Sequence, residues 1–249
     1  NHGDEAAARA LTRQLSDKNA DFSMLYNASG DCFELDLPLN FKNLRNTKPI
    51  SALEKLQVMA SIYLPEWLVS PFFSRDVRKE YDMIATSDMV ISMPGGANLG
   101  LYNDWRYLWR LLIAQRLGKK TAIYSVSIGP FQDNSFRKFA FQVLKNADWL
   151  SLRDAKSIEY GRSEGVEFHE SIDTAFLVQD FPNQDGLALS DFGIPFEAKS
   201  YCVFVPNNLK TGHITFRGVK QENLDNIYLS LLNKSLSTGH NVVMLPQLF

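Results

Sequence analysis

The side chains of this chain that are best suited to bind a ligand follow its β-rich runs. Arg153 comes directly after the apolar run Trp149 to Leu152, and an arginine at the end of a buried strand is costly unless its charge is paired. One account is a salt bridge to Asp154 or to another nearby carboxylate. The other is a guanidinium that points into a cleft and binds a carboxylate or a phosphate bidentately. The sequence weighs these two accounts equally.

Two more segments place polar or flexible residues after a β-rich run. Gly95 and Gly96 allow a backbone to approach a ligand closely, and the loop that contains them leads to Asp104. Asp104 is either the N-cap of the next helix or a general base. Ser125 and Ser127 end the next β-rich run, so their hydroxyls are candidates to face a ligand, although strand-end serines are common.

The first residues, Asn1 to Glu5, are expected to form a turn that leads directly into a helix. The free N–H groups of a helix N-terminus can bind an anion. Asp4 and Glu5 already supply negative charge there, which argues against a phosphate bound directly on that end. A cap and turn without a ligand is the alternative.

Other common types of catalytic or metal site are not indicated. None of the four histidines lies in a spacing typical of zinc ligands, and the chain has no Gly-x-Ser-x-Gly motif. We expect His169, beside two glutamates, to lie in an exposed loop. No cofactor and no metal are expected.

Composition narrows the class of protein further. The 249 residues are 45% hydrophobic and 22% charged, which is typical of a globular protein, and the net charge of −2 gives no global field for nucleic acid. The two cysteines, far apart in the sequence, suit a reducing cytoplasm. No transmembrane segment is expected. We expect the chain to be part of a longer protein, because it opens in a turn and closes on a strand pattern.

Helical and β-rich segments alternate along the chain, which predicts an α/β fold with a parallel sheet covered on both faces. The poorly patterned stretch from Phe181 to Lys199 is the best candidate for a domain boundary. The helices are expected from Asp4 to about Leu15, Ser51 to Leu64, Arg75 to Thr86, Asp104 to Leu117, Ser135 to Asn146, Ala155 to Arg162 and Asn223 to Leu236. The strands are expected at Phe22 to Tyr26, Cys32 to Leu37, Met89 to Met93, Thr121 to Val126, Trp149 to Leu152, Tyr201 to Val205 and Asn241 to Leu245.

Taken together, these loops resemble the polysaccharide pyruvyl transferase family. Many relatives have a third glycine where this chain has Ala97, and they continue beyond Phe249 with a second domain that bears an arginine and histidine pair. Five segments in the family's order carry the resemblance: Asn1 to Ala6; Asp88 to Ile91 leading to Gly95, Gly96 and Asp104; Ser127 to Pro130; Asp148 to Ser157; and Ser171 to Phe176.

The resemblance implies two Rossmann-like domains that face each other across a cleft, as in GT-B glycosyltransferases. The first would cover residues 1–190, and residues 191–249 would begin the second. It also implies transfer of a pyruvyl group from phosphoenolpyruvate to a sugar of an exopolysaccharide or cell-wall polymer precursor, which forms a ketal and releases phosphate. Phosphoenolpyruvate is then a donor substrate, and a lipid-linked acceptor would bring the protein peripherally to a membrane.

Roles for single residues follow from this resemblance. Arg153 would bind the donor anion, and Asp104 would orient or deprotonate the sugar hydroxyl. Gly95 and Gly96 would allow close backbone approach. The remaining residues expected to bind substrate or to shape its loops are Asn1, Gly3, Asp4, Ser127 and Asp173.

Two other functions fit the same pattern. A GT-B glycosyltransferase with a nucleotide-sugar donor shares the architecture, and a non-catalytic carbohydrate-binding protein would keep the fold without turnover. Release of phosphate would indicate pyruvyl transfer, and release of UDP would indicate a glycosyltransferase. Sugar binding without donor turnover would identify the non-catalytic binding protein. No motif predicts an oligomeric state.

Overall fold

The computed structural model describes residues 2–16, 21–26, 42–45, 51–93, 99–100, 102–177, 193, 201–206 and 220–245. The chain divides into two compact units. One is His2–Gln179, and the other is Asp180–Phe249 together with Asn1.

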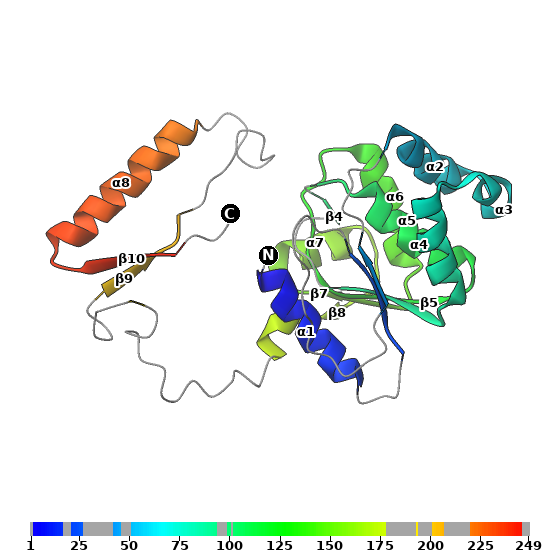
Figure 1. Cartoon of the computed structure of the whole chain (residues 1–249), viewed down its shortest axis with the longest axis horizontal. Helices are drawn as coiled ribbons and strands as arrows, with labels where there is room; N and C mark the ends of the chain where they lie inside the picture. Colours follow the sequence, from blue (N-terminus) through cyan, green and yellow to red (C-terminus); the bar gives the residue numbers. More distant parts are fainter. Residues whose placement is uncertain are drawn as a thin grey trace. The chain divides into compact units, whose positions relative to one another are not determined.

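The first unit is built on a parallel sheet. Its strands β3 (Met89–Ser92), β5 (Lys120–Val126), β7 (Trp149–Leu152) and β8 (His169–Glu170) lie in that order, and every neighbouring pair is parallel. The helices α5 (Trp105–Arg116), α6 (Asn134–Lys145) and α7 (Ala155–Ser163) connect successive strands, and Figure 1 shows them on one side of the sheet. This confirms an α/β protein with a parallel sheet.

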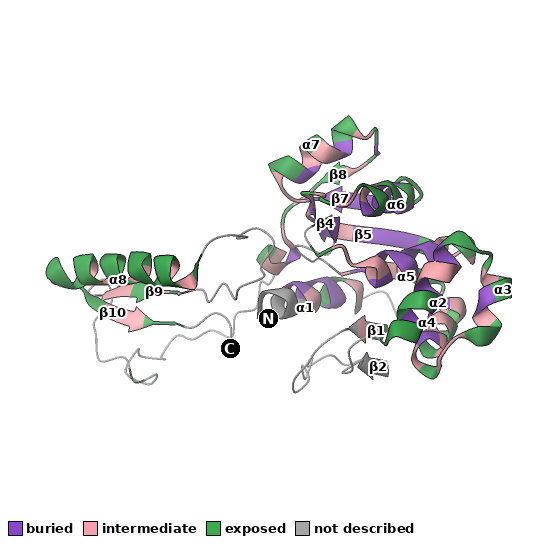
Figure 2. Ribbon diagram, turned by 90° about the horizontal axis from the view of Figure 1, so that it is seen from above, coloured by how far each residue is buried: buried purple, intermediate pink, exposed green. Residues whose placement is uncertain are grey.

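The core lies between this sheet and its helices. Trp109 and Leu108 of α5, Ile123 of β5 and Phe136 of α6 are fully buried. The interior strand β5 is drawn almost wholly as buried in Figure 2. Trp109, the largest of these side chains, therefore belongs to the core.

Local sequence signals set the helix ends. The capping box of Ser51 and Glu54 begins α2 (Ala52–Tyr63), and Ser74 caps α4 (Arg75–Thr86). Gly118, with a φ of 69°, follows the end of α5. The short helix α3 (Glu66–Val69) and the 3-10 helix η1 (Ser70–Phe72) after Pro65 were not expected from the sequence.

Smaller elements complete the first unit. Helix α1 (His2–Ser16) comes first, and strands β1 (Ser23–Tyr26) and β2 (Lys42–Arg45) form a parallel pair. The two-residue strands β4 (Leu99–Gly100) and β6 (Ile128–Gly129) pair in parallel, and the 3-10 helix η2 (Thr174–Leu177) follows β8. The strand expected from Cys32 to Leu37 lies outside the described residues.

The second unit contains one βαβ arrangement. Strands β9 (Tyr201–Phe204) and β10 (Asn241–Met244) pair in parallel, and α8 (Gln221–Ser237) connects them. All three elements were expected from the sequence. No helix in the described part of either unit is long and apolar enough to span a membrane.

Candidate functional site

Three of the expected site residues meet at the carboxyl edge of the sheet, where ligands bind in open parallel sheets. Ser127 follows β5, Arg153 follows β7 and Asp173 follows β8. The Arg153 Nε donates to the Ser127 hydroxyl at 3.1 Å, and its Nη1 is ion-paired with Asp173 Oδ2. The side chains of Arg153 and Asp173 remain 20% and 31% exposed. This edge of the sheet therefore presents a cation that is oriented and partly open to solvent.

The structure shows the first of the two accounts of the Arg153 charge, a salt bridge to a carboxylate. The carboxylate partner is Asp173, 20 residues further along the chain in the same unit, and not the adjacent Asp154. The third guanidinium nitrogen, Nη2, makes no hydrogen bond to any residue in the described part of the chain. The two N–H groups of Nη2, on an otherwise fixed guanidinium, are thus left for a further acceptor.

Asp154 has a different task, as the N-cap of α7. Its carboxylate accepts from the Ser157 N–H at 2.9 Å and from the Ser157 hydroxyl at 2.7 Å. Burial alone would raise the pKa of Asp154, but hydrogen bonds from Ser127 and Ser157 and the charge of Arg153 outweigh it, so the pKa lies below 3.8. Asp154 is therefore an anion at neutral pH that helps to hold Ser127 and Arg153 in place.

The loop after β5 is fixed by the same network. The buried Ser157 hydroxyl accepts from the Ile128 N–H at 2.8 Å. Ile128 and Gly129 form β6, which pairs in parallel with β4. A Cβ added at Gly100 would lie 2.6 Å from the Gly129 backbone, so glycine is required for this close approach.

Asp173 also connects the arginine to α1. Its Oδ1 accepts from the Ala175 N–H at 2.9 Å at the start of η2, and the buried Thr174 hydroxyl donates to the Ala7 carbonyl of α1 at 3.1 Å. The expected turn at the start of the chain is corrected here, because α1 already begins at His2 and its first turn contains Gly3 and Asp4. Acidic residues in a first turn favour such an early start.

Ser125 does not face a ligand, contrary to the suggestion from its place at a strand end. It is fully buried, with a φ of 49°. Its hydroxyl donates to the Ile172 carbonyl at 2.8 Å and lies 3.1 Å from the Ser171 hydroxyl. Ser125 thus anchors the segment between β8 and Asp173.

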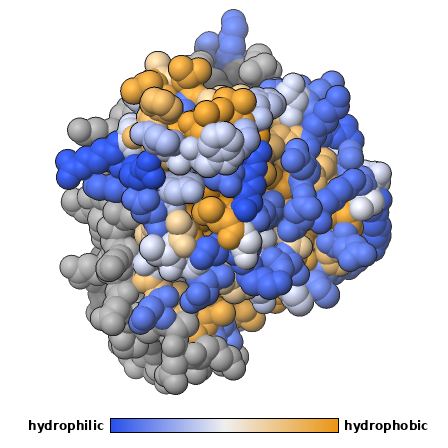
Figure 3. All heavy atoms as spheres, turned by 90° about the vertical axis from the view of Figure 1, so that its right-hand side faces the viewer, coloured by the Kyte–Doolittle hydropathy of each residue, from blue (hydrophilic) through white to orange (hydrophobic). Residues whose placement is uncertain are grey.

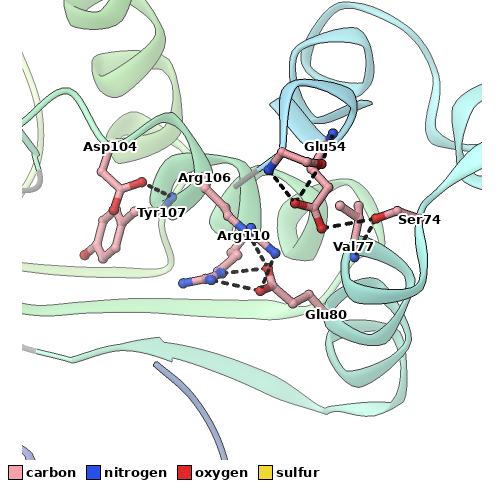
Figure 4. Close-up of polar contacts among 9 residues, drawn as sticks. Glu54, Ser74, Val77, Glu80, Asp104, Arg106, Tyr107 and Arg110 are labelled. Carbon is pink, nitrogen blue, oxygen red and sulfur yellow. Dashed lines mark hydrogen bonds and ion pairs between the residues drawn. The ribbon is translucent and has the colours of Figure 1, made fainter. Parts of the chain in front are cut away.

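Asp104 is the N-cap of α5, and its Oδ1 accepts from the Tyr107 N–H at 3.0 Å (Figure 4). Its other oxygen makes no hydrogen bond to the residues that the structure describes. Burial raises the pKa of Tyr107 to about 12, and the Asp104 charge adds to the effect, against the lowering influence of the Ser92 hydrogen bond and Arg110. The helix itself is fixed by Glu80, which binds Arg106 and Arg110 together.

Several predictions about the site fall elsewhere. Asn1, Gly95 and Gly96 lie outside the described residues. His169 is exposed as expected, but it belongs to β8 and stacks on Trp149 with ring centroids 3.9 Å apart. The roles of Ser157, which holds Ile128, and of Thr174, which holds α1, were not predicted from the sequence. The only sequence signal for them is that each follows an aspartate by one to three residues.

The opposite edge of the sheet has a different character. A depression of about 460 Å³ lies there, between the start of β5 and the residue before β7. Two of its three cations are engaged: Lys120 pairs with Asp148 at 2.6 Å, and Arg116 donates to the Ser61 and Ile62 carbonyls. The described residues contain no group of three or more His, Cys, Asp or Glu that could hold a metal. We therefore place the candidate site at the carboxyl edge.

Fold and site together define an α/β protein with an arginine-centred polar network at the carboxyl edge of a parallel sheet. A family model described as polysaccharide pyruvyl transferase matches residues 1–248, so the chain belongs to that family. It is 28% identical over 149 residues to the amylovoran biosynthesis protein AmsJ of Erwinia amylovora, a match of 56% of this chain. That match spans 35% of AmsJ, about a third of its length. No solved structure matches the chain.

Proposed function

We propose that the protein transfers a pyruvyl group from phosphoenolpyruvate to a sugar of an exopolysaccharide or cell-wall polymer precursor. One observation carries the proposal. Three of the segments that carry the family resemblance, Ser127 to Pro130, Asp148 to Ser157 and Ser171 to Phe176, are joined at one sheet edge through Arg153, Asp173 and their hydrogen-bond partners. Strand β4, which precedes Asp104, pairs with β6 beside them. Membership of a transferase family and the similarity to an amylovoran biosynthesis protein support it.

The donor explains the need for the guanidinium. Phosphoenolpyruvate carries a phosphate and a carboxylate, so its negative charge exceeds that of the single Asp173 carboxylate. Ser127 and Asp173 orient the Nε and Nη1 of Arg153 and leave Nη2 for the donor. We infer that Arg153 binds the donor anion and that Asp173 keeps the guanidinium oriented at the carboxyl edge of the sheet.

The reaction proposed here is addition followed by loss of phosphate. A proton adds to carbon 3 of the donor, which makes carbon 2 electrophilic, and a sugar hydroxyl attacks carbon 2 and gives up its proton. Phosphate leaves, and a second sugar hydroxyl closes the ketal with loss of its own proton. Asp104 is the candidate base for the attacking hydroxyl, through the carboxylate oxygen that does not cap α5.

The second unit supports a GT-B-like arrangement. Its βαβ element is the usual opening of a Rossmann-like domain, so we propose that residues 191–249 begin a second domain after a first domain over residues 1–190. A lipid-linked acceptor would bring the enzyme to a membrane surface. The cytoplasmic location expected from the cysteines stays a prediction.

The test uses the full-length protein with phosphoenolpyruvate and sugar acceptors, and in parallel with a panel of UDP-sugars. The proposal expects phosphate release that depends on phosphoenolpyruvate and acceptor. Release of UDP instead would identify a glycosyltransferase, and sugar binding without turnover of either donor would identify a binding protein.

Arg153→Ala is expected to lower turnover by at least about a hundredfold, since a charge-assisted contact in a closed site is worth on the order of 3–5 kcal/mol. Arg153→Lys keeps a cation beside Asp173 but loses the planar fork, so it should not restore turnover. The matched control is Arg137→Ala, which removes the arginine of another ion pair, the one with Glu164. Full activity of the lysine variant would reduce Arg153 to a structural ion pair.

A further inference from the structure

Helix α2 buries three polar residues beside the apolar Val58 and Ile62, and turns further apolar side chains to the surface. Glu54, Gln57 and Ser61 are buried, whereas Leu56 and Tyr63 are 66% and 70% exposed. A surface helix normally turns its apolar stripe to the core. The outward apolar stripe of α2 therefore needs an explanation.

Packing fixes this orientation. The Gln57 side chain donates to the Phe72 carbonyl at 2.6 Å and accepts from the Ser74 N–H at 3.0 Å. The Ser61 hydroxyl accepts from the Trp109 indole at 2.6 Å, inside the core. A rotation that buried the leucines would leave these polar groups without partners, which costs about 1–3 kcal/mol for each group. The outward stripe is a stable property of the fold.

The stripe continues into the next two elements and forms one surface, which we name the apolar face. Figure 3 views the molecule from the side of α2 and α3 and shows hydrophobic side chains gathered at the top of that side. Contiguous apolar patches of this kind mark interaction sites on soluble proteins. The exposed members of the apolar face are Leu53, Leu56, Tyr63, Leu64, Trp67, Leu68 and Phe72.

Exposed cations lie in the same segment of the chain as the apolar face. Of the acidic groups of that segment, Glu54 and Glu80 are buried in hydrogen bonds, Glu66 and Asp76 are half-buried, the exposed Asp82 lies 3.8 Å from Arg78, and Asp88 is exposed after the end of α4. The exposed cations of the same segment are Lys55, Arg75 and Lys79. An apolar face beside exposed cations is complementary to the interface of a membrane that contains anionic lipids.

We propose that the apolar face binds the interface of an anionic membrane, with the leucines in contact with acyl chains and Tyr63 and Trp67 at the level of the headgroups. A second copy fits less well, because a two-fold contact through this face would bring the same cations of both copies together. The role of this membrane contact rests on the proposed function, in which the enzyme would meet a lipid-linked sugar acceptor at a membrane surface.

The test is flotation of the full chain with vesicles of phosphatidylcholine alone and with vesicles that also contain phosphatidylglycerol. We expect binding to the anionic vesicles that weakens with salt. Leu56→Glu should weaken binding about tenfold or more, since it puts a charge where the proposed contact would bury a leucine in the membrane. Ile227→Glu on α8, at a residue that is 56% exposed, is the matched control and should bind as the parent protein does.

A second measurement locates the contact. Brominated lipids should quench the fluorescence of the parent protein, and Trp67→Phe should remove most of that quenching while vesicle binding persists. Three outcomes would overturn the proposal: no binding to anionic vesicles, equal binding of Leu56→Glu and Ile227→Glu, or a change of oligomeric state in Leu56→Glu with vesicle binding unaffected.

These outcomes are separable from the fate of the proposed function. Pyruvyl transfer to a water-soluble sugar acceptor without vesicle binding would overturn the membrane contact alone. Vesicle binding through the apolar face without donor turnover would leave the contact standing and overturn the transferase proposal.

Discussion

Replacing Glu80 by glutamine should destabilise the first unit by about 3 kcal/mol. Glu80 is 4% exposed and accepts from Nε and Nη2 of both Arg106 and Arg110, at 2.8–3.1 Å. The Arg106 side chain is only 2% exposed, and its Nη1 is buried without a hydrogen-bond partner in the described structure. Removing one partner of a buried pair costs about 3–5 kcal/mol, because the other charge stays buried.

Glu54 places this estimate at the lower end of that range. Burial raises the pKa of Glu54, but hydrogen bonds from Ser51 and Ser74 and the charge of Arg106 lower it overall, so one carboxylate near Arg106 remains ionised in the variant. About 3 kcal/mol is still a large share of the 5–15 kcal/mol that is usual for a folded domain. The substitution would also weaken the attachment of α5, the helix that Asp104 caps, to α4.

Urea unfolding followed by tryptophan fluorescence measures the effect, because Trp109 is buried beside this cluster. The matched control is Glu164→Gln, which removes a carboxylate from the pair with Arg137, where the side chains are 25% and 40% exposed. An exposed pair is worth less than about 1 kcal/mol. If the two variants lost the same stability, the reasoning about the buried cluster would be wrong.

Two further predictions concern the network at the carboxyl edge. Ser157→Ala leaves the buried Ile128 N–H without its acceptor and should cost about 1–3 kcal/mol in urea unfolding, whereas Ser163→Ala on the exposed side of α7 should cost little. Asp154 has a lowered pKa in the folded protein, so its contribution is present above pH 3.8 and is lost as the pH falls through the folded value. The difference in unfolding free energy between the parent and Asp154→Asn should therefore shrink below about pH 4; a difference that stayed constant with pH would contradict the ionised cap.

The sequence was most informative where a structure is set by neighbours along the chain. The capping box at Ser51 and the stop at Gly118 place two helix ends within a residue or two of the observed ones. The two-residue strands β4, β6 and β8 were missed, because so short a strand exists only through its partner's register. The exposed apolar side chains of α2 were missed for a related reason: periodicity shows where apolar residues recur along a helix, and only packing shows which of them are buried.

The site shows the same division between local and distant causes. Arg153 and Asp173 were both expected at the site, but nothing within either segment indicates that they pair across 20 residues. Their meeting depends on β7 and β8 ending at one edge, which is a property of the sheet. Asp104, in contrast, caps a helix within its own segment, and that part of its role was visible in the sequence.

The pairing of Arg153 with Asp173 is compatible with the binding of phosphoenolpyruvate, because a guanidinium has several N–H groups. A lysine neutralised by a carboxylate presents one point charge that a ligand must share with its partner, whereas a guanidinium divides its donors among several acceptors. Here Nε is committed to Ser127 and Nη1 to Asp173, so the plane of the group is fixed before any anion arrives. Asp173 in turn is held by the Ala175 N–H, and Thr174 ties the same segment to α1. A change in α1 would therefore reach the guanidinium through two adjacent residues.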